Sequence, residues 1–99
     1  MDTRYRILVD SQLGPREGEL LLHTEQGRVE GTFRLLGFDN PVSGECVGQT
    51  YRLRHKLQTL TRELTCLTGF ESRDDEIAGF LETEHTKMSL RGCRIPARG

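Results

Sequence analysis

His55 and Tyr51 are the side chains whose types and spacing best suit chemistry on a small molecule. They lie four residues apart, and strand alternation places both on the face that carries Leu53 and Leu57. If this face points inward, an imidazole and a phenol would orient a bound ligand or exchange a proton with it near neutral pH. The alternative is that His55 bonds a neighbouring backbone carbonyl or lies at a rim. We predict ligand-binding roles for His55 and Tyr51.

Two segments rich in glycine, proline and polar residues, 10–16 and 37–44, are predicted to be loops. If both loops lie at the same end of the fold, their polar side chains would line its mouth. Loops held by a rigid scaffold often carry binding residues, so Asp39, Asn40 and Arg16 join the predicted ligand site. Turn chemistry alone would equally explain the aspartate and the asparagine.

No catalytic motif of known spacing is present: the chain lacks G-x-S-x-G, a Walker loop and H-E-x-x-H. No histidine lies within four residues of a cysteine or of another histidine, so we expect neither a metal ion nor a cofactor. The cysteines, Cys46, Cys66 and Cys93, are odd in number and form no C-x-x-C pair, which favours reduced thiols in a cytoplasmic protein. We expect a protein that is not an enzyme.

The nearly equal numbers of basic and acidic residues argue against nucleic acid or an anionic membrane as a partner. Fourteen basic and 15 acidic residues give a net charge of −1, which provides no pull toward nucleic acid or an anionic membrane. A basic stripe, Arg52, Arg54 and Lys56, is expected to form cross-strand ion pairs with the acidic region 71–84. No apolar stretch is long enough to span a membrane, and the N-terminal residues lack the apolar core of a signal peptide. A cytoplasmic location follows as a prediction.

Alternating segments separated by glycine and proline predict eight short strands at 4–10, 17–24, 28–36, 45–50, 51–58, 63–72, 76–83 and 87–95. Leucines at helical spacing leave a short helix within 52–64 as an alternative. Strands joined mostly by hairpins predict one all-β domain over 1–99, with a frayed tail at 96–99. The expected architecture is a small antiparallel up-and-down barrel, or a closed sandwich.

An apolar-x-Gly pattern recurs at 29–31, 67–69, 77–79 and 90–92. Glycine weakens a strand, so repeated use needs a reason. We predict that these glycines face inward where the strands of a narrow barrel bend. The alternative is a set of unrelated bulges.

The segments Gly18–Leu22, Gly27–Phe33, Gly69-Phe70, Ile77–Leu81 and Leu90–Gly92 resemble the repeating hairpins of small bacterial lipocalin-like, or calycin-type, β-barrels. The chain has no tryptophan and so lacks the N-terminal Gly-x-Trp signature of true lipocalins. The resemblance implies a closed barrel that binds a small, partly apolar molecule.

An outward apolar patch provides a second functional hypothesis. Leu8, Leu21, Leu36 and Phe80 all fall opposite the faces assigned to the core. If they cluster, they would form an interface for a homodimer or another protein partner. The two expectations are therefore a non-enzymatic ligand-binding barrel and, alternatively, an interaction or homo-oligomerisation module.

Overall fold

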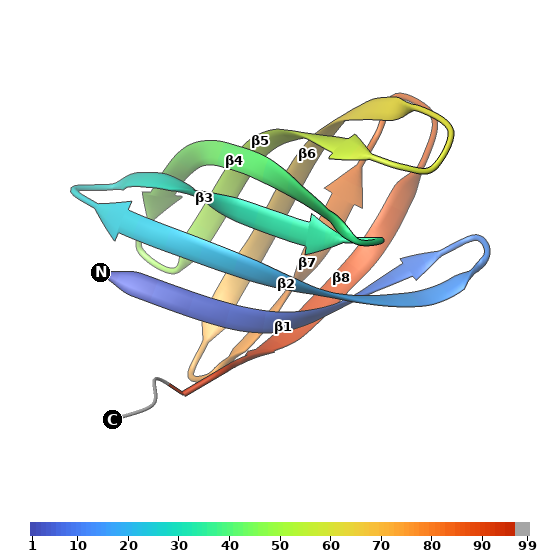
Figure 1. Ribbon diagram of the computed structural model, residues 1–99. Helices are drawn as coiled ribbons and strands as arrows, with labels where there is room; N and C mark the ends of the chain where they lie inside the picture. The colour runs from blue at the N-terminus through green and yellow to red at the C-terminus, as the bar shows by residue number, and fades with distance from the viewer. Residues whose placement is uncertain (97–99) are drawn as a thin grey trace.

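The computed structural model describes residues 1–96 and contains eight antiparallel strands joined by tight turns (Figure 1). The strands are β1 (Asp2–Ser11), β2 (Gly14–Glu25), β3 (Arg28–Leu35), β4 (Phe38–Val47), β5 (Thr50–Gln58), β6 (Glu63–Arg73), β7 (Glu76–Glu82) and β8 (Lys87–Arg94). Each strand pairs with its neighbours in chain order. The predicted number of strands and their up-and-down order are confirmed.

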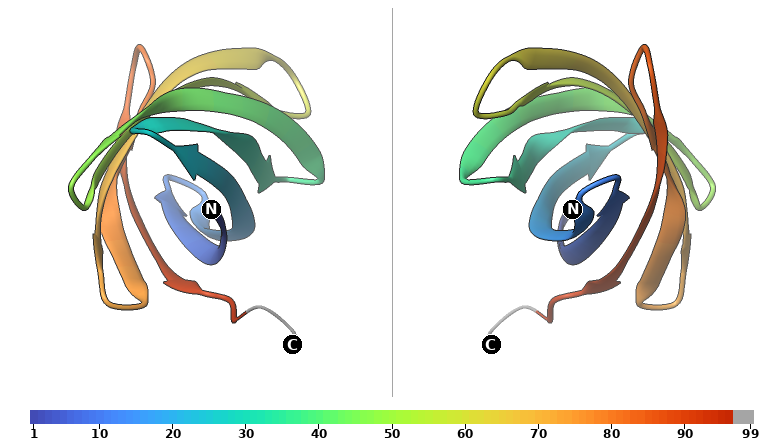
Figure 2. Two further views of the ribbon diagram at one scale, coloured as in Figure 1. Left: turned by 90° about the vertical axis from the view of Figure 1, so that its left-hand side faces the viewer. Right: turned by 90° about the vertical axis from the view of Figure 1, so that its right-hand side faces the viewer.

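The first and last strands close the sheet into a barrel. β1 pairs with β8 from Tyr5 opposite Arg94 to Val9 opposite Leu90. Figure 2 views the barrel from two sides and shows the strands following one another around it. Closure removes the free edges that a sandwich would keep. The predicted small antiparallel barrel is therefore confirmed, and so is the general shape expected from the calycin resemblance.

The interior is filled by side chains that alternate along every strand. Its aromatic and aliphatic members include Phe33, Leu20 and Leu81, which have no exposed surface. The inward faces predicted for 4–10 and 28–36 are confirmed. The buried apolar side chains are Tyr5, Ile7, Val9, Leu20, Leu22, Val29, Phe33, Leu35, Val42, Leu53, Leu57, Cys66, Phe70, Ile77, Leu81 and Leu90.

Inward glycines allow neighbouring strands to approach closely. A Cβ atom at Gly31, Gly44 or Gly79 would overlap a backbone carbonyl oxygen of the adjacent strand. The steric role predicted for the repeated glycines is confirmed at 31, 79 and 92. It is wrong at Gly69, because Cys66, Thr68 and Phe70 face inward and place this glycine on the outer wall.

The loop predicted at 37–44 is wrong, because these residues belong mostly to β4. The turn lies earlier, at Leu36 and Gly37, which both adopt positive φ. The strand predicted at 45–50 is also misplaced, since it crosses the turn that contains Gly48. Proline misled the prediction: Pro41 lies within β4, and pairing with β5 starts only at the next residue, Val42.

The alternative helix in 52–64 does not form. β5 and β6 cover most of this segment, and a turn joins them in which the Thr59 hydroxyl accepts a hydrogen bond from the Arg62 amide at 3.1 Å. Leu60, one of the helically spaced leucines, is exposed in that turn.

The β1–β2 hairpin projects beyond the rest of the barrel (Figure 1). β1 and β2 pair as far as Ser11 opposite Gly14, whereas the pairing of β2 with β3 begins only at Gly18. Among residues 1–96 there is no helix long and apolar enough to cross a membrane. The frayed tail predicted at 96–99 lies outside the described residues from Ala97 onward.

Candidate functional site

A seam opens in the wall where β4 and β5 stop pairing. The last pair is Val42 opposite His55, and the seam continues from there between the first half of β4 and the end of β5. Asn40 bridges it: its Nδ2 donates to the Phe33 carbonyl at 3.0 Å, and its Oδ1 accepts from the Gln58 amide at 2.8 Å. The side-chain oxygen thus gives the Gln58 amide the acceptor that the interrupted β4–β5 ladder does not supply, while Nδ2 ties the side chain to β3.

His55 closes the same seam from β5. Its Nδ1 lies 3.0 Å from the Lys56 carbonyl and its Nε2 lies 2.7 Å from Oγ1 of Thr68. A carbonyl only accepts, so Nδ1 carries the proton and Nε2 accepts from the Thr68 hydroxyl. The ring stacks on Phe33 with centroids 4.9 Å apart. Burial lowers the pKa of His55, although the bond to Lys56 opposes this shift, and the imidazole is neutral at neutral pH.

The outer mouth of the seam is a depression of about 660 Å³ over β4, β5 and the start of β6. Three of the predicted ligand residues, Asp39, Asn40 and His55, line it. Asp39 points outward and accepts from Nε of Arg34 at 2.8 Å. Lys56 lies 3.4 Å from a Glu63 carboxylate oxygen. The polar groups at this seam therefore already have partners within the protein.

The basic stripe on β5 finds partners other than the expected ones. Arg54 forms an ion pair with Glu45 of β4, which lowers the pKa of that carboxyl, and Lys56 pairs with Glu63 of β6. The expected pairs with the acidic region 71–84 do not form, because the register places Leu67 rather than a carboxylate opposite Arg54 on β6.

Tyr51 lies toward the other end of β5, away from His55. Its ring stacks on Phe70 with centroids 4.7 Å apart, and Tyr5 meets Phe70 edge-on at 6.1 Å. Burial, reinforced by Cys46, raises the pKa of Tyr51 to about 12. Four residues of extended strand span about 13 Å, so the structure does not bring Tyr51 and His55 together.

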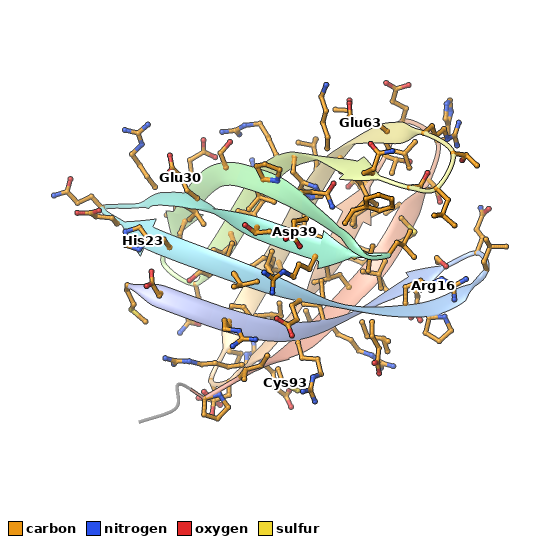
Figure 3. The ribbon with its side chains drawn as sticks, viewed as in Figure 1. Arg16, His23, Glu30, Asp39, Glu63 and Cys93 are labelled. Atoms are coloured by element: carbon orange, nitrogen blue, oxygen red, sulfur yellow. The ribbon has the colours of Figure 1, made fainter. Side chains whose placement is uncertain are left out.

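Arg16 is on the projecting β1–β2 hairpin, where the register places it opposite Val9. Figure 3 shows it well away from Asp39. Of the five residues predicted to bind a ligand, three meet at the seam and two lie elsewhere. Their binding roles stay predictions.

The four residues of the predicted apolar patch lie at separate places on the outer wall. Leu8 is flanked by Glu17 and Arg91 in the register. The other three do not adjoin it or one another: Leu21 lies between Arg4 and Thr32, Leu36 is in the β3–β4 turn, and Phe80 lies between Gly69 and Ser89 with Lys87 over its ring. Their interface role stays a prediction.

A larger depression, of about 990 Å³, crosses the outer wall over β1, β7 and β8. We call it the outer groove. Its lining includes Leu8, Ala78 and Cys93 together with several arginine and glutamate side chains. Figure 3 shows Cys93 on the outside of the barrel beside β1 and β8. Of these three residues, only Leu8 was predicted from the sequence to have a functional role.

Arg6 and Arg91 are the groove residues that sequence reasoning missed. Neither forms an ion pair with a carboxylate of residues 1–96, whereas Arg4, Arg34 and Arg54 all do. They come from the first and last strands, and no local sequence signal indicates that β1 pairs with β8.

In the part of the chain that the structure describes, no group of three or more histidine, cysteine, aspartate or glutamate side chains is arranged to hold a metal ion. No protein-family model matches the chain, and no curated protein matches it in sequence. Functional inference therefore depends on the seam and the outer groove.

Proposed function

We propose that this chain is a non-enzymatic binding domain that takes a small, partly apolar ligand in the outer groove. The observation that supports this most is the groove itself, whose volume of about 990 Å³ is the size of a small-molecule pocket. Leu8 and Ala78 in its lining supply apolar contact, and the register places charged residues opposite each of them. Kinship with lipocalin-like barrels and a cytoplasmic location belong to the same proposal, supported by the barrel shape and the free thiols.

The barrel interior is a weaker candidate for the ligand. Sixteen buried apolar side chains form one cluster there, and the buried polar groups near the seam satisfy one another. A ligand inside would have to displace this packing, at a cost comparable to that of overpacking a core. The outer groove needs no such displacement.

The groove also lacks an arrangement suited to nucleophilic catalysis. Cys93 provides a thiol, but no histidine is among the described groove-lining residues. A cysteine nucleophile is normally activated by such a base. This supports binding rather than turnover.

The proposal is tested by native mass spectrometry and by thermal unfolding with octanoate and octan-1-ol as probes. We expect at least one probe to stabilise the folded chain by about 1.4 kcal/mol at a tenfold excess over its Kd. Ala78→Phe should fill the groove and abolish this, whereas Ser43→Phe, on the outer face of β4, should not.

The proposal fails if neither probe stabilises the protein and the purified chain retains no added mass. A dimer mass with nothing bound would instead favour the alternative proposal, homo-oligomerisation through the outward leucine and phenylalanine residues.

A further inference from the structure

Two rows of side chains cross the outer groove from β2 to β6. The register aligns them across β2, β1, β8, β7 and β6 in that order. The first row is Glu19, Arg6, Cys93, Glu76 and Arg73, and the second is Glu17, Leu8, Arg91, Ala78 and Glu71. Residues directly opposite each other and their diagonal neighbours can interact, so both relations decide which charges in these rows are balanced.

The carboxylate opposite Arg6 is bound by other arginines. Glu19 lies directly opposite Arg6, but its carboxylate is bound by Arg4 at 3.0 Å and approached by Arg34 at 3.9 Å. On its other side Arg6 faces the thiol of Cys93. Its guanidinium therefore forms no ion pair with a carboxylate of residues 1–96.

Arg91 lies between two apolar residues. Leu8 is opposite it on β1 and Ala78 is opposite it on β7. The acidic residues of this row, Glu17 and Glu71, lie one strand further out on each side, about 10 Å from Arg91. In the other row, Glu76 is opposite Cys93 and Arg73, which makes it a diagonal neighbour of Arg91, just as Glu17 is a diagonal neighbour of Arg6. Neither Glu17 nor Glu76 forms an ion pair with its neighbouring arginine.

Resting on the proposed function, we infer that the ligand of the outer groove is an apolar monocarboxylate held between Arg6 and Arg91. These two arginines are diagonal neighbours across β1 and β8, about 7–8 Å apart. Guanidinium groups bind carboxylates through paired, charge-assisted hydrogen bonds. The apolar part of the ligand lies over Leu8 and Ala78, next to the head group.

Calorimetric titration of the full chain with octanoate and octan-1-ol tests the inference. One charge-assisted interaction corresponds to about tenfold in affinity, so octanoate should bind about tenfold or more tightly than octan-1-ol. Arg91→Gln or Arg6→Gln should remove this difference and leave octan-1-ol binding unchanged. Arg52→Gln, an exposed arginine on β5 with no ion pair to residues 1–96, is the matched control and should change neither.

Cys93 offers a second readout inside the groove. Octanoate should slow its alkylation by the neutral reagent iodoacetamide, while Cys46, which is outside the groove, should react at an unchanged rate. If octan-1-ol and octanoate bound equally and both protected Cys93, the inference that the ligand is a carboxylate would be overturned and the proposed function would stand. No binding of either probe and no protection would overturn the proposed function itself.

Discussion

Polar side chains have opposite environments in two regions of the barrel. One region is the seam between β4 and β5, and the other is the outer groove over β1, β7 and β8. At the seam, Asn40 and His55 are buried and every hydrogen-bonding atom of their side chains has a partner within the protein. In the groove, Arg6 and Arg91 are exposed and have no ion pair with the described residues. Satisfied buried groups hold a structure together, whereas unpaired exposed charges remain available to a ligand.

This difference explains why residue type alone did not indicate the binding site. An asparagine and a histidine in a small barrel suggested a binding site, but they replace the β4–β5 pairing that ends at Val42. Ordinary surface arginines suggested nothing, because only the barrel register shows which of them lack a carboxylate.

The largest expected effect concerns the closeness of β4 and β5 just before the seam. A Cβ atom at Gly44 would overlap the Arg52 carbonyl oxygen, so Gly44→Ala must push the strands apart. We expect a loss of about 3 kcal/mol or more in the free energy of unfolding, measured by urea denaturation. Gly69→Ala is the control, since its Cβ would meet nothing nearer than 3.7 Å. Equal losses in both variants would contradict this account.

Removing the bridge across the seam should have the next largest effect. Asn40→Ala leaves the Gln58 amide without its partner and removes the side-chain hydrogen bond to the Phe33 carbonyl, and we expect a loss of about 2 kcal/mol. Arg91→Ala in the groove should change the free energy of unfolding by less than about 0.5 kcal/mol. If Arg91→Ala proved as destabilising as Asn40→Ala, the distinction between a structural seam and an available groove would be lost.

The smallest effect is a pH dependence carried by His55. Its folded-state pKa is lowered by burial from the ordinary 6.5, so the unfolded chain takes up the proton first as the pH falls. Its contribution to stability is thus complete above about pH 6.5 and is lost below it, by at most about 1.4 kcal/mol per pH unit. Urea denaturation between pH 7.5 and 5 should show this loss, and His55→Gln should remove it.

His23 serves as the opposite case in the same experiment. Hydrogen bonds to Asp2 and Glu25 raise its pKa, so its stabilising contribution is complete below about pH 6.5 and is lost as the pH rises through the folded-state value. His23→Gln should therefore remove a loss on the alkaline side. An unchanged pH profile in His55→Gln would show that the seam histidine is not held neutral.

Local sequence features were sufficient for most of the fold. Alternation placed Tyr5, Ile7 and Val9 inside, and eight strands followed from turn residues between alternating segments. Prediction failed over 37–44, where proline, asparagine and glycine are typical of a loop. There the pairing of β4 with β3 holds the segment in a strand, and Asn40 supplies one hydrogen bond on the β5 side.

At the two candidate sites, local sequence likewise determined some features and strand pairing determined the others. Residue type and alternation alone placed His55 on the inward face, because the period of a strand is a local property. The hydrogen bond of Asn40 with Gln58, the ion pair of Glu19 with Arg4, and the diagonal placement of Arg6 and Arg91 were decided only by how the strands pair in the tertiary structure. Each depends on the register between strands, and β1 and β8 are too far apart in the sequence for any local pattern to specify how they pair.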